Sequence, residues 1–147
     1  QSSMFDSVLM VCAGNICRSP TAEYVLKSKL AGKNVKVSSA GLTALEGKSA
    51  DSFAQQLALQ HGVDMSEHKG QQISTSLVTH NSVILVMEKR HLEDLCTRYP
   101  QARGKTFLLG KWLGDKEVPD PYRQSREAFE HVYELIDSAC SAWQKYL

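Results

Sequence analysis

The chain has 147 residues, of which 42% are hydrophobic and 22% are charged, as is typical of one globular domain with a single core. Lys and Arg number 17 against 16 Asp and Glu, giving a formal net charge of +1, so no overall positive field favours nucleic acid or an anionic membrane. Without a signal peptide or an apolar run of roughly 20 residues, we expect a soluble cytoplasmic protein with no membrane insertion. We interpret residues 1–3 as a remnant of an expression tag and residues 4–147 as one domain.

The first half of the chain predicts two strands, each followed by a helix. Residues 7–12 form a short apolar run before a glycine-containing loop, which is typical of a buried strand. Ser19 and Pro20 favour a helix that starts there, with the serine as its cap, and continues to about residue 30. Residues 33–40 alternate apolar and polar side chains as a strand does, and residues 50–60 predict a helix that ends before a His-Gly pair.

The second half repeats this alternation. Residues 82–87 are a continuous apolar run, and the apolar spacing over 92–99 predicts a helix that stops before a proline. Residues 106–109 predict a fourth strand, and an apolar stripe over 129–143 predicts a long last helix. Strands that alternate with helices predict an α/β fold, with a parallel sheet and helices on both faces.

The loop after the first strand carries the residues best suited to chemistry. In parallel sheets ligands bind beyond the carboxyl ends of the strands, which is where Cys12 stands. Backbone N–H groups from Ala13 to Arg18, together with the start of the following helix, are able to surround an anion, and Gly14 and Asn15 tolerate the left-handed backbone of a tight loop. Arg18 offers a planar fork that matches two phosphate oxygens, and this positive surrounding should stabilise the Cys12 thiolate as a nucleophile. We therefore expect a loop that binds an oxyanion and attacks it.

Other uses of these residues fit less well. The loop lacks the lysine of a nucleotide-phosphate loop and the glycine triplet of a dinucleotide site, and Cys12 and Cys17 lack a second pair of zinc ligands. Cys96 and Cys140 fall on the apolar stripes of predicted helices, so we expect core packing there and no disulfide framework. A chance juxtaposition of Cys12 and Arg18 stays open at this point.

Asp120 strengthens the catalytic interpretation. It stands between Pro119 and Pro121, which fix the backbone and exclude a helix or a central strand. A carboxylic acid on such a stiff turn is able to protonate a leaving oxygen while a thiol attacks phosphorus, and then to activate water. Alone, Asp120 would be interpreted as a turn residue.

The stretch from Cys12 to Pro20, taken with Asp120-Pro121-Tyr122, resembles the low-molecular-weight protein tyrosine phosphatases, and the similarity extends from Met4 to the end of the chain. The likeness is greatest to the bacterial subgroup that dephosphorylates tyrosine autokinases controlling capsule or exopolysaccharide export. It implies a four-stranded parallel sheet flanked by helices, with a phosphate-binding loop between the first strand and the first helix. It implies hydrolysis of phosphotyrosine through a phosphocysteine intermediate, with no cofactor and no metal.

The resemblance assigns roles by position. Cys12 is the expected nucleophile, Arg18 the phosphate clamp, and Asp120 the general acid and then base. Ser19 is expected to hydrogen-bond the Cys12 thiolate, and Asn15 to shape the loop through a strained backbone. The whole phosphate-binding loop comprises Cys12, Ala13, Gly14, Asn15, Ile16, Cys17, Arg18 and Ser19.

Further positions follow from the same resemblance. A network that includes Ser39 and His68 is expected to hold the loop, although a surface position for the histidine is an alternative. Cys17 corresponds to a second loop cysteine that forms a reversible disulfide with Cys12 on oxidation, protecting the nucleophile.

The rim of the substrate slot is expected to involve Leu45, Tyr122 and Arg123. Tyr122 should stack on the phosphotyrosine ring, whereas Leu45 and Arg123 stand where many relatives have aromatic residues. Arg123 and Arg126 either meet acidic groups of the substrate or are solvated at the start of the last helix.

Two alternative functions remain at this stage. A thioredoxin-coupled arsenate reductase shares this fold and loop but needs neighbouring downstream cysteines, whereas Cys96 and Cys140 are far apart in sequence. A silent phosphotyrosine-binding module is the other alternative. The expected partner is a phosphotyrosine protein, in particular a bacterial membrane tyrosine autokinase, with no nucleic acid bound and a chain that is monomeric or weakly self-associating.

Overall fold

The computed structural model describes residues 6–122 and 124–147. The expected tag remnant, Met4 and Arg123 lie outside the described residues. Within the described residues, the chain forms a four-stranded parallel sheet in the order β2-β1-β3-β4. The strands are β1 (Ser7–Cys12), β2 (Lys36–Gly41), β3 (Val83–Val86) and β4 (Thr106–Leu108). This confirms the α/β class and the parallel sheet.

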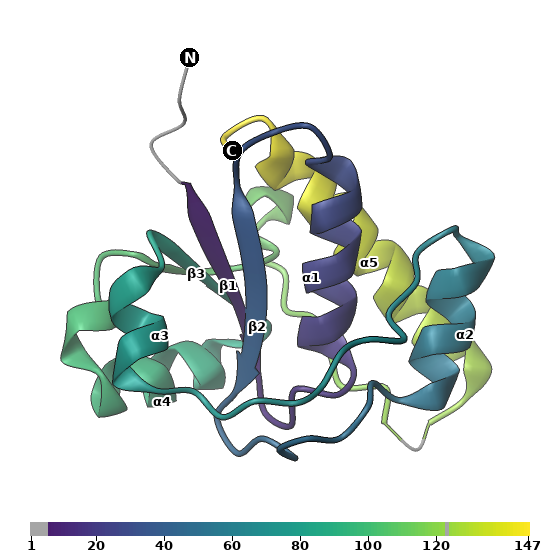
Figure 1. Ribbon diagram of the computed structural model, residues 1–147, viewed down its shortest axis with the longest axis horizontal. Helices are drawn as coiled ribbons and strands as arrows, with labels where there is room; N and C mark the ends of the chain where they lie inside the picture. The colour runs from purple at the N-terminus through teal and green to yellow at the C-terminus, as the bar shows by residue number, and fades with distance from the viewer. Residues whose placement is uncertain (1–5, 123) are drawn as a thin grey trace.

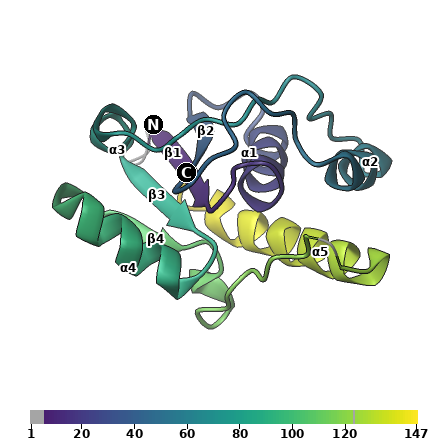
Figure 2. The ribbon, with the colours of Figure 1, turned by 90° about the horizontal axis from the view of Figure 1, so that it is seen from below.

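Helices cover both faces of the sheet (Figures 1 and 2). One face carries α1 (Arg18–Lys29), α2 (Ser52–Gln60) and α5 (Arg126–Gln144), and the other carries α3 (Thr75–His80) and α4 (Lys89–Arg98). Two short 3₁₀ turns, Pro100–Ala102 and Lys111–Leu113, flank β4. The alternation of strand and helix therefore buries the sheet on both sides, as its apolar strands require.

Two local predictions need correction. The structure adds α3, capped by Ser74, whose hydroxyl accepts the Leu77 N–H; this one-and-a-half-turn segment is too short to show an apolar period. The first helix begins at Arg18 with no side-chain cap, so Ser19 and Pro20 lie inside its first turn. Ser19 is not the cap because its hydroxyl is bonded to the Cys12 and Asn15 side chains instead.

The core is divided by the sheet into two clusters. The cluster beneath α1, α2 and α5 contains Cys140 and Trp143, whose indole Nε1 donates to the Leu109 carbonyl at 2.8 Å. The cluster beneath α3 and α4 contains Cys96. Both cysteines are buried and free, which confirms their assignment to the core.

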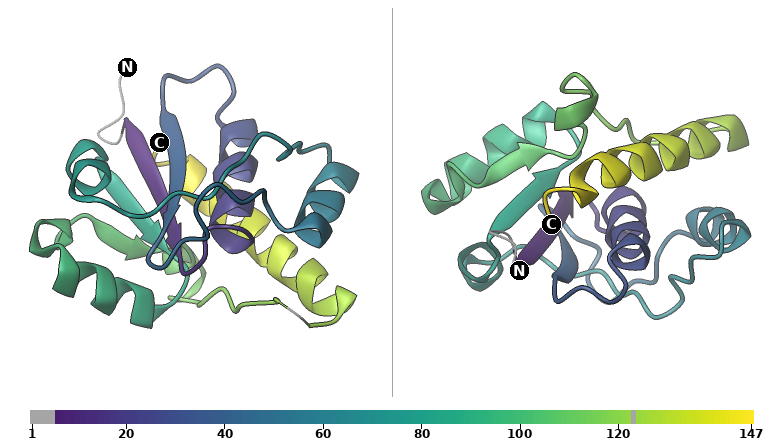
Figure 3. Two further views of the ribbon diagram at one scale, coloured as in Figure 1. Left: turned by 60° about the horizontal axis from the view of Figure 1, so that its bottom comes forward. Right: turned by 90° about the horizontal axis from the view of Figure 1, so that it is seen from above.

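The C-terminal end of α5 returns to the amino ends of the strands (Figure 3). There the Leu147 carbonyl accepts a hydrogen bond from Lys33 Nζ. The opposite, carboxyl edge of the sheet is therefore clear of the chain end. Along residues 6–122 and 124–147, no helix has the length and apolar character needed to cross a membrane.

Candidate active site

The loop from Cys12 to Ser19 lies at the carboxyl edge of the sheet, between β1 and α1 (Figure 1). A cavity of about 150 Å³ opens there. Segments distant in sequence bring Leu45, Asp120 and Tyr122 to the cavity that the loop lines. The lining residues are Cys12, Ala13, Gly14, Asn15, Ile16, Cys17, Arg18, Leu45, Asp120 and Tyr122.

The carbonyl groups of the loop are all engaged with the surrounding frame. Backbone N–H groups of the connection after β2 bind the first carbonyls at 2.9–3.0 Å: Leu42 to Cys12, Thr43 to Ala13 and Leu45 to Gly14. The remaining carbonyls receive bonds from His68 to Asn15, from the Asp51 N–H to Ile16, and from Thr21 to Cys17. The loop is therefore held by other segments from Cys12 to Ile16 and by α1 at Cys17.

The backbone N–H groups of the same loop, unlike its carbonyls, are not bonded to the described part of the protein. From Ala13 to Cys17, none donates to a protein acceptor within the described residues. Because the carbonyls are directed into the frame, these N–H groups and the first turn of α1 supply positive dipole ends beside Cys12. Such a nest binds a tetrahedral oxyanion.

A short chain of polar side chains lies beside the Cys12 thiol. Ser19 Oγ is 2.9 Å from Cys12 Sγ and accepts a hydrogen bond from Asn15 Nδ2 at 2.8 Å. Both Ser19 and Asn15 are fully buried. With its acceptor lone pair occupied by Asn15, the Ser19 hydroxyl is free to donate to a thiolate.

Asn15 has a left-handed backbone, with φ 58°. Its carbonyl accepts from His68 Nε2 and its side-chain oxygen accepts from the Gln71 N–H, each at 2.8 Å. The buried Glu23 carboxylate lies behind this group, accepting from Ser39 Oγ and lying 3.9 Å from His68 Nδ1. His68 is thus a buried supporting residue and not a surface histidine.

The Arg18 guanidinium is buried and held on one side. Its Nη1 donates to Glu88 Oε2 and, at 3.0 Å, to the Val118 carbonyl. Its Nη2 lies 3.9 Å from Asp120 Oδ2. This leaves the guanidinium edge that carries Nε and Nη2 available for a bidentate anion.

Glu88 is ionised in this setting. Partial burial opposes its charge, but hydrogen bonds from Arg90 and Arg18 outweigh burial and lower the pKa of Glu88 to about 2. A permanent negative charge therefore lies behind Arg18. Glu88 has no predicted role, although it follows a buried apolar run just as the loop after β1 does.

Asp120 lies at the mouth of the cavity on the turn that its flanking prolines predict. Its Oδ1 accepts the Tyr122 N–H at 3.0 Å, and the carboxylate is 48% exposed. Tyr122 and Leu45 are also exposed, at 45% and 48%, and stand at the rim. The arrangement presents an acid and two apolar walls above the nest.

Cys17 lines the same cavity as Cys12, and both thiols are free. Burial, followed by the charges of Asp51 and Cys12, raises the pKa of the Cys17 thiol, so it is protonated at neutral pH. Cys17 therefore fits a resting thiol better than a nucleophile.

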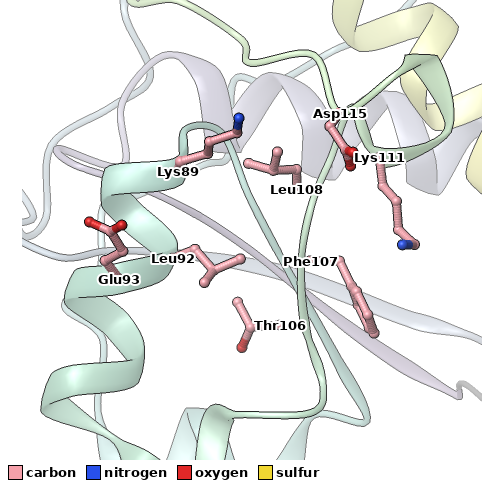
Figure 4. Close-up of a pocket in the computed structure, with 8 residues that line it drawn as sticks. All are labelled: Lys89, Leu92, Glu93, Thr106, Phe107, Leu108, Lys111 and Asp115. Carbon is pink, nitrogen blue, oxygen red and sulfur yellow. The ribbon is translucent and has the colours of Figure 1, made fainter.

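A second cavity, of about 310 Å³, lies between α4 and β4 (Figure 4). Its lining includes the apolar residues Leu92, Phe107 and Leu108 and the charged residues Lys89 and Asp115. Its lining has neither a thiol nor an anion nest, so the smaller cavity is the candidate active site. In the described parts of the chain, no group of three or more His, Cys, Asp or Glu side chains could hold a metal ion.

Comparison with known proteins agrees with this geometry. Residues 7–147 match the low molecular weight phosphotyrosine protein phosphatase family. The chain belongs to this family. The phosphatase is 47% identical over 144 residues to the low molecular weight protein-tyrosine-phosphatase Wzb of Escherichia coli K12, covering 98% of this chain and 97% of that one. It is 46% identical over 140 residues to the probable phosphatase AmsI of Erwinia amylovora, covering 95% and 96%.

A solved structure shows the same fold. Vibrio vulnificus Wzb in complex with benzylphosphonate is 50% identical to the phosphatase and superimposes with a TM-score of 0.93, covering 97% of this chain and 99% of that one. The chain is thus a protein tyrosine phosphatase of the low-molecular-weight family, which confirms the expected resemblance.

Proposed function

We propose that this phosphatase hydrolyses phosphotyrosine through a phosphocysteine intermediate formed on Cys12. The observation that carries the proposal is the loop whose carbonyls from Cys12 to Cys17 are all bonded, while its N–H groups from Ala13 to Cys17 have no acceptor among the described residues. Phosphoryl oxygens would take these N–H groups and the free edge of Arg18 as donors. Ser19 would donate to the Cys12 thiolate, stabilising it as a nucleophile and as a leaving group.

Asp120 would move the protons. As Cys12 Sγ bonds to phosphorus, the bond from phosphorus to the tyrosine oxygen breaks, and protonated Asp120 gives its proton to that oxygen. Asp120 then takes a proton from water while the water oxygen bonds to phosphorus. The S–P bond breaks, which releases inorganic phosphate and restores the thiolate and the protonated acid. Asp120 Oδ2 lies 3.9 Å from Arg18 Nη2. The acid therefore lies next to the proposed phosphate clamp, which supports its role.

The substrate class follows from the rim. A slot between Tyr122 and Leu45 suits a planar ring above the phosphate nest. Wzb of V. vulnificus, 50% identical, is in complex with benzylphosphonate, which joins a benzyl ring to a phosphonate. We expect Arg123 to extend this rim, and Arg126 is exposed where α5 begins.

An arsenate reductase is not favoured. Such an enzyme passes a disulfide between neighbouring cysteines, but Cys96 and Cys140 lie in core clusters on opposite faces of the sheet. Burial also raises the pKa of Cys140 to about 12, which suppresses its thiolate. Cys17 alone lies with Cys12, and we expect this pair to form a protective disulfide on oxidation.

The physiological partner we propose is a bacterial membrane tyrosine autokinase that controls capsule or exopolysaccharide production, reached from the cytoplasm. Full-length similarity to Wzb and AmsI supports this assignment. Free buried thiols suit a reducing compartment. A pull-down with the Cys12→Ser protein from the native cell extract should recover a kinase with a phosphorylated tyrosine-rich segment, and recovery of no phosphotyrosine protein would contradict the assignment.

We expect the phosphatase to be a monomer or to self-associate weakly.

The decisive test of the chemistry compares two cysteine substitutions. Cys12→Ser should lower turnover of a phosphotyrosine peptide by about a thousandfold or more, because an alcohol replaces the thiolate, while the peptide still binds. Cys96→Ser, in the core on the other side of the sheet, is the matched control and should keep turnover within about threefold. Turnover by Cys12→Ser at the parent rate would refute the proposed nucleophile.

A further inference from the structure

His91, on α4, has the one buried side-chain polar atom without a hydrogen-bond partner in the described residues: its Nε2. The side chain is only 3% exposed. Buried polar atoms in folded proteins are nearly always hydrogen-bonded, because an unmade bond in the interior leaves the group desolvated without compensation. The position of this atom therefore calls for a physical reason.

The neighbouring contacts fix the protonation of the ring. His91 Nδ1 accepts the Glu88 backbone N–H at 3.2 Å, so the ring proton of a neutral imidazole is on Nε2. In return, the Glu88 backbone carbonyl accepts the His91 backbone N–H at 3.0 Å, at the start of α4. The Nε2–H donor is thus locked beneath Glu88 without an acceptor.

An acceptor close to this atom is the oxygen that binds Arg18. His91 Nε2 lies 3.8 Å from Glu88 Oε2, and Arg18 Nη1 donates to that same oxygen. A movement of about 1 Å would bring Nε2 within hydrogen-bond distance. This oxygen also accepts a hydrogen bond from Arg90 Nη2 at 3.3 Å. It therefore has a buried donor, Arg18, and an exposed donor, Arg90, in place, with His91 Nε2 just out of reach.

His91 is uncharged at neutral pH. Burial, then the positive charge of Arg18, lowers the pKa of His91 to about 4. Arg90 acts in the same direction, while Glu88 and Asp94 oppose it. The ring is consequently a donor that brings no positive charge to compete with Arg18 for a phosphate dianion.

We propose that His91 is a positioning residue for Arg18, and that its Nε2–H becomes the donor to Glu88 Oε2 when a phosphoryl group draws the Arg18 guanidinium toward the loop. The inference rests on the proposed role of Arg18 as phosphate clamp. The partly buried Glu88 carboxylate resists the loss of its Arg18 donor, because its charge becomes less solvated. A replacement donor removes that resistance, so the clamp closes at a lower free-energy cost.

The first test follows the proton itself. In ¹⁵N-labelled protein, the His91 Nε2–H signal is recorded while inorganic phosphate is added. The proposal expects the proton signal to move downfield, and its exchange with water to slow, as the site saturates. An Nε2–H signal that stays unchanged while the phosphate-loop N–H signals shift would overturn the proposal.

The second test compares variants by direct titration with inorganic phosphate and by steady-state kinetics. His91→Leu fills the volume but removes both ring nitrogens, and it should weaken phosphate binding about tenfold, with kcat/KM for an aryl phosphate falling in parallel. His91→Gln supplies both an acceptor and an uncharged donor, and it should restore binding to within about threefold of the parent. Rescue by Gln is not expected if the ring only fills space.

Ser74→Ala is the matched control, because it removes the cap of α3, on the same side of the sheet as α4. It should lower the unfolding temperature without changing phosphate affinity. A folded His91→Leu protein with the parent's phosphate affinity would overturn the inference about His91 and leave the proposed function standing. Failure of the parent to bind phosphate would overturn the proposed function together with it.

Discussion

Asp120 illustrates how one residue is prepared by its immediate neighbours. Its Oδ1 accepts the Tyr122 N–H, while its Oδ2 faces Arg18 at 3.9 Å. The carboxylate is thereby oriented across the mouth of the cavity, with one oxygen directed to the site. Pro119 and Pro121 stiffen the turn that carries it. The orientation of the Asp120 carboxylate depends on this hydrogen bond and the two prolines more than on burial, since the side chain is half exposed.

Removal of this acid should depend on the leaving group. Asp120→Asn keeps the turn but cannot protonate the departing oxygen, so kcat should fall about 10²–10³-fold for phosphotyrosine. The fall should be smaller for p-nitrophenyl phosphate, because nitrophenolate leaves more readily without a proton. Steady-state kinetics on both substrates measure the difference. Equal losses on the two substrates would contradict a role as general acid.

At the scale of the element, the start of α2 is tied to the catalytic loop. The Asp51 N–H donates to the Ile16 carbonyl, and its side chain accepts from the N–H groups of Phe53 and Ala54. One residue therefore begins a helix and holds the loop through different atoms. The two tasks are separable by substitution.

Asp51→Ala should lower the free energy of unfolding by about 1 kcal/mol, because two helix N–H groups lose their acceptor. The backbone bond to Ile16 remains, so kcat/KM should stay within about twofold. Urea unfolding and an aryl phosphate assay measure the two quantities. The neighbouring Ser52→Ala, at an exposed position, serves as the control. A large loss of kcat/KM with no loss of stability would contradict this division.

The elements that could be predicted from sequence are those whose signal is local. Continuous apolar runs located β1 and β3, and the stripe over 129–143 located α5. The short α3 escaped because six residues show no period. The prediction of Ser19 as a cap was wrong because its hydroxyl makes a hydrogen bond with the Cys12 thiol, seven positions earlier in the chain.

The same distinction holds for the site. Cys12 and Arg18 share one loop, and Asp120 stands in a distinctive proline turn, so residue chemistry and resemblance were enough to select them. Glu88 and Gln71 were not selected, because their partners, Arg18 and Asn15, are about 56–70 positions away. Such pairings exist only once the strands are ordered in the sheet.

At the scale of the whole molecule, the buried His91 and the partly buried Glu88 make the free energy of unfolding depend on pH. The pKa of His91 is lowered from 6.5 to about 4 by burial and Arg18, so between these values the unfolded chain binds a proton that the folded chain does not. The pKa of Glu88 is lowered from 4.5 to about 2. Both contributions are complete at neutral pH and are lost on acidification, His91 first.

The free energy of unfolding should therefore fall between pH 6.5 and pH 4 by an amount on the order of 3 kcal/mol from His91. Urea unfolding across this range measures it. His91→Gln, which cannot be protonated, should show a shallower slope there but keep the Glu88 contribution at lower pH. Parallel curves for the parent and the variant would contradict the assignment.

The outward bonding of the loop carbonyls has a consequence for how this activity could be moved to another protein. The donors to the carbonyls from Cys12 to Ile16 are Leu42, Thr43, Leu45, Asp51 and His68, which all belong to the connection between β2 and α3. Grafting residues 12–19 alone onto a foreign α/β sheet would transfer Cys12 and Arg18 without the donors that fix the shape of the loop. The smallest unit that keeps the shape of the loop is the loop together with residues 41–72, a stretch that supplies neither the proposed nucleophile nor the proposed general acid.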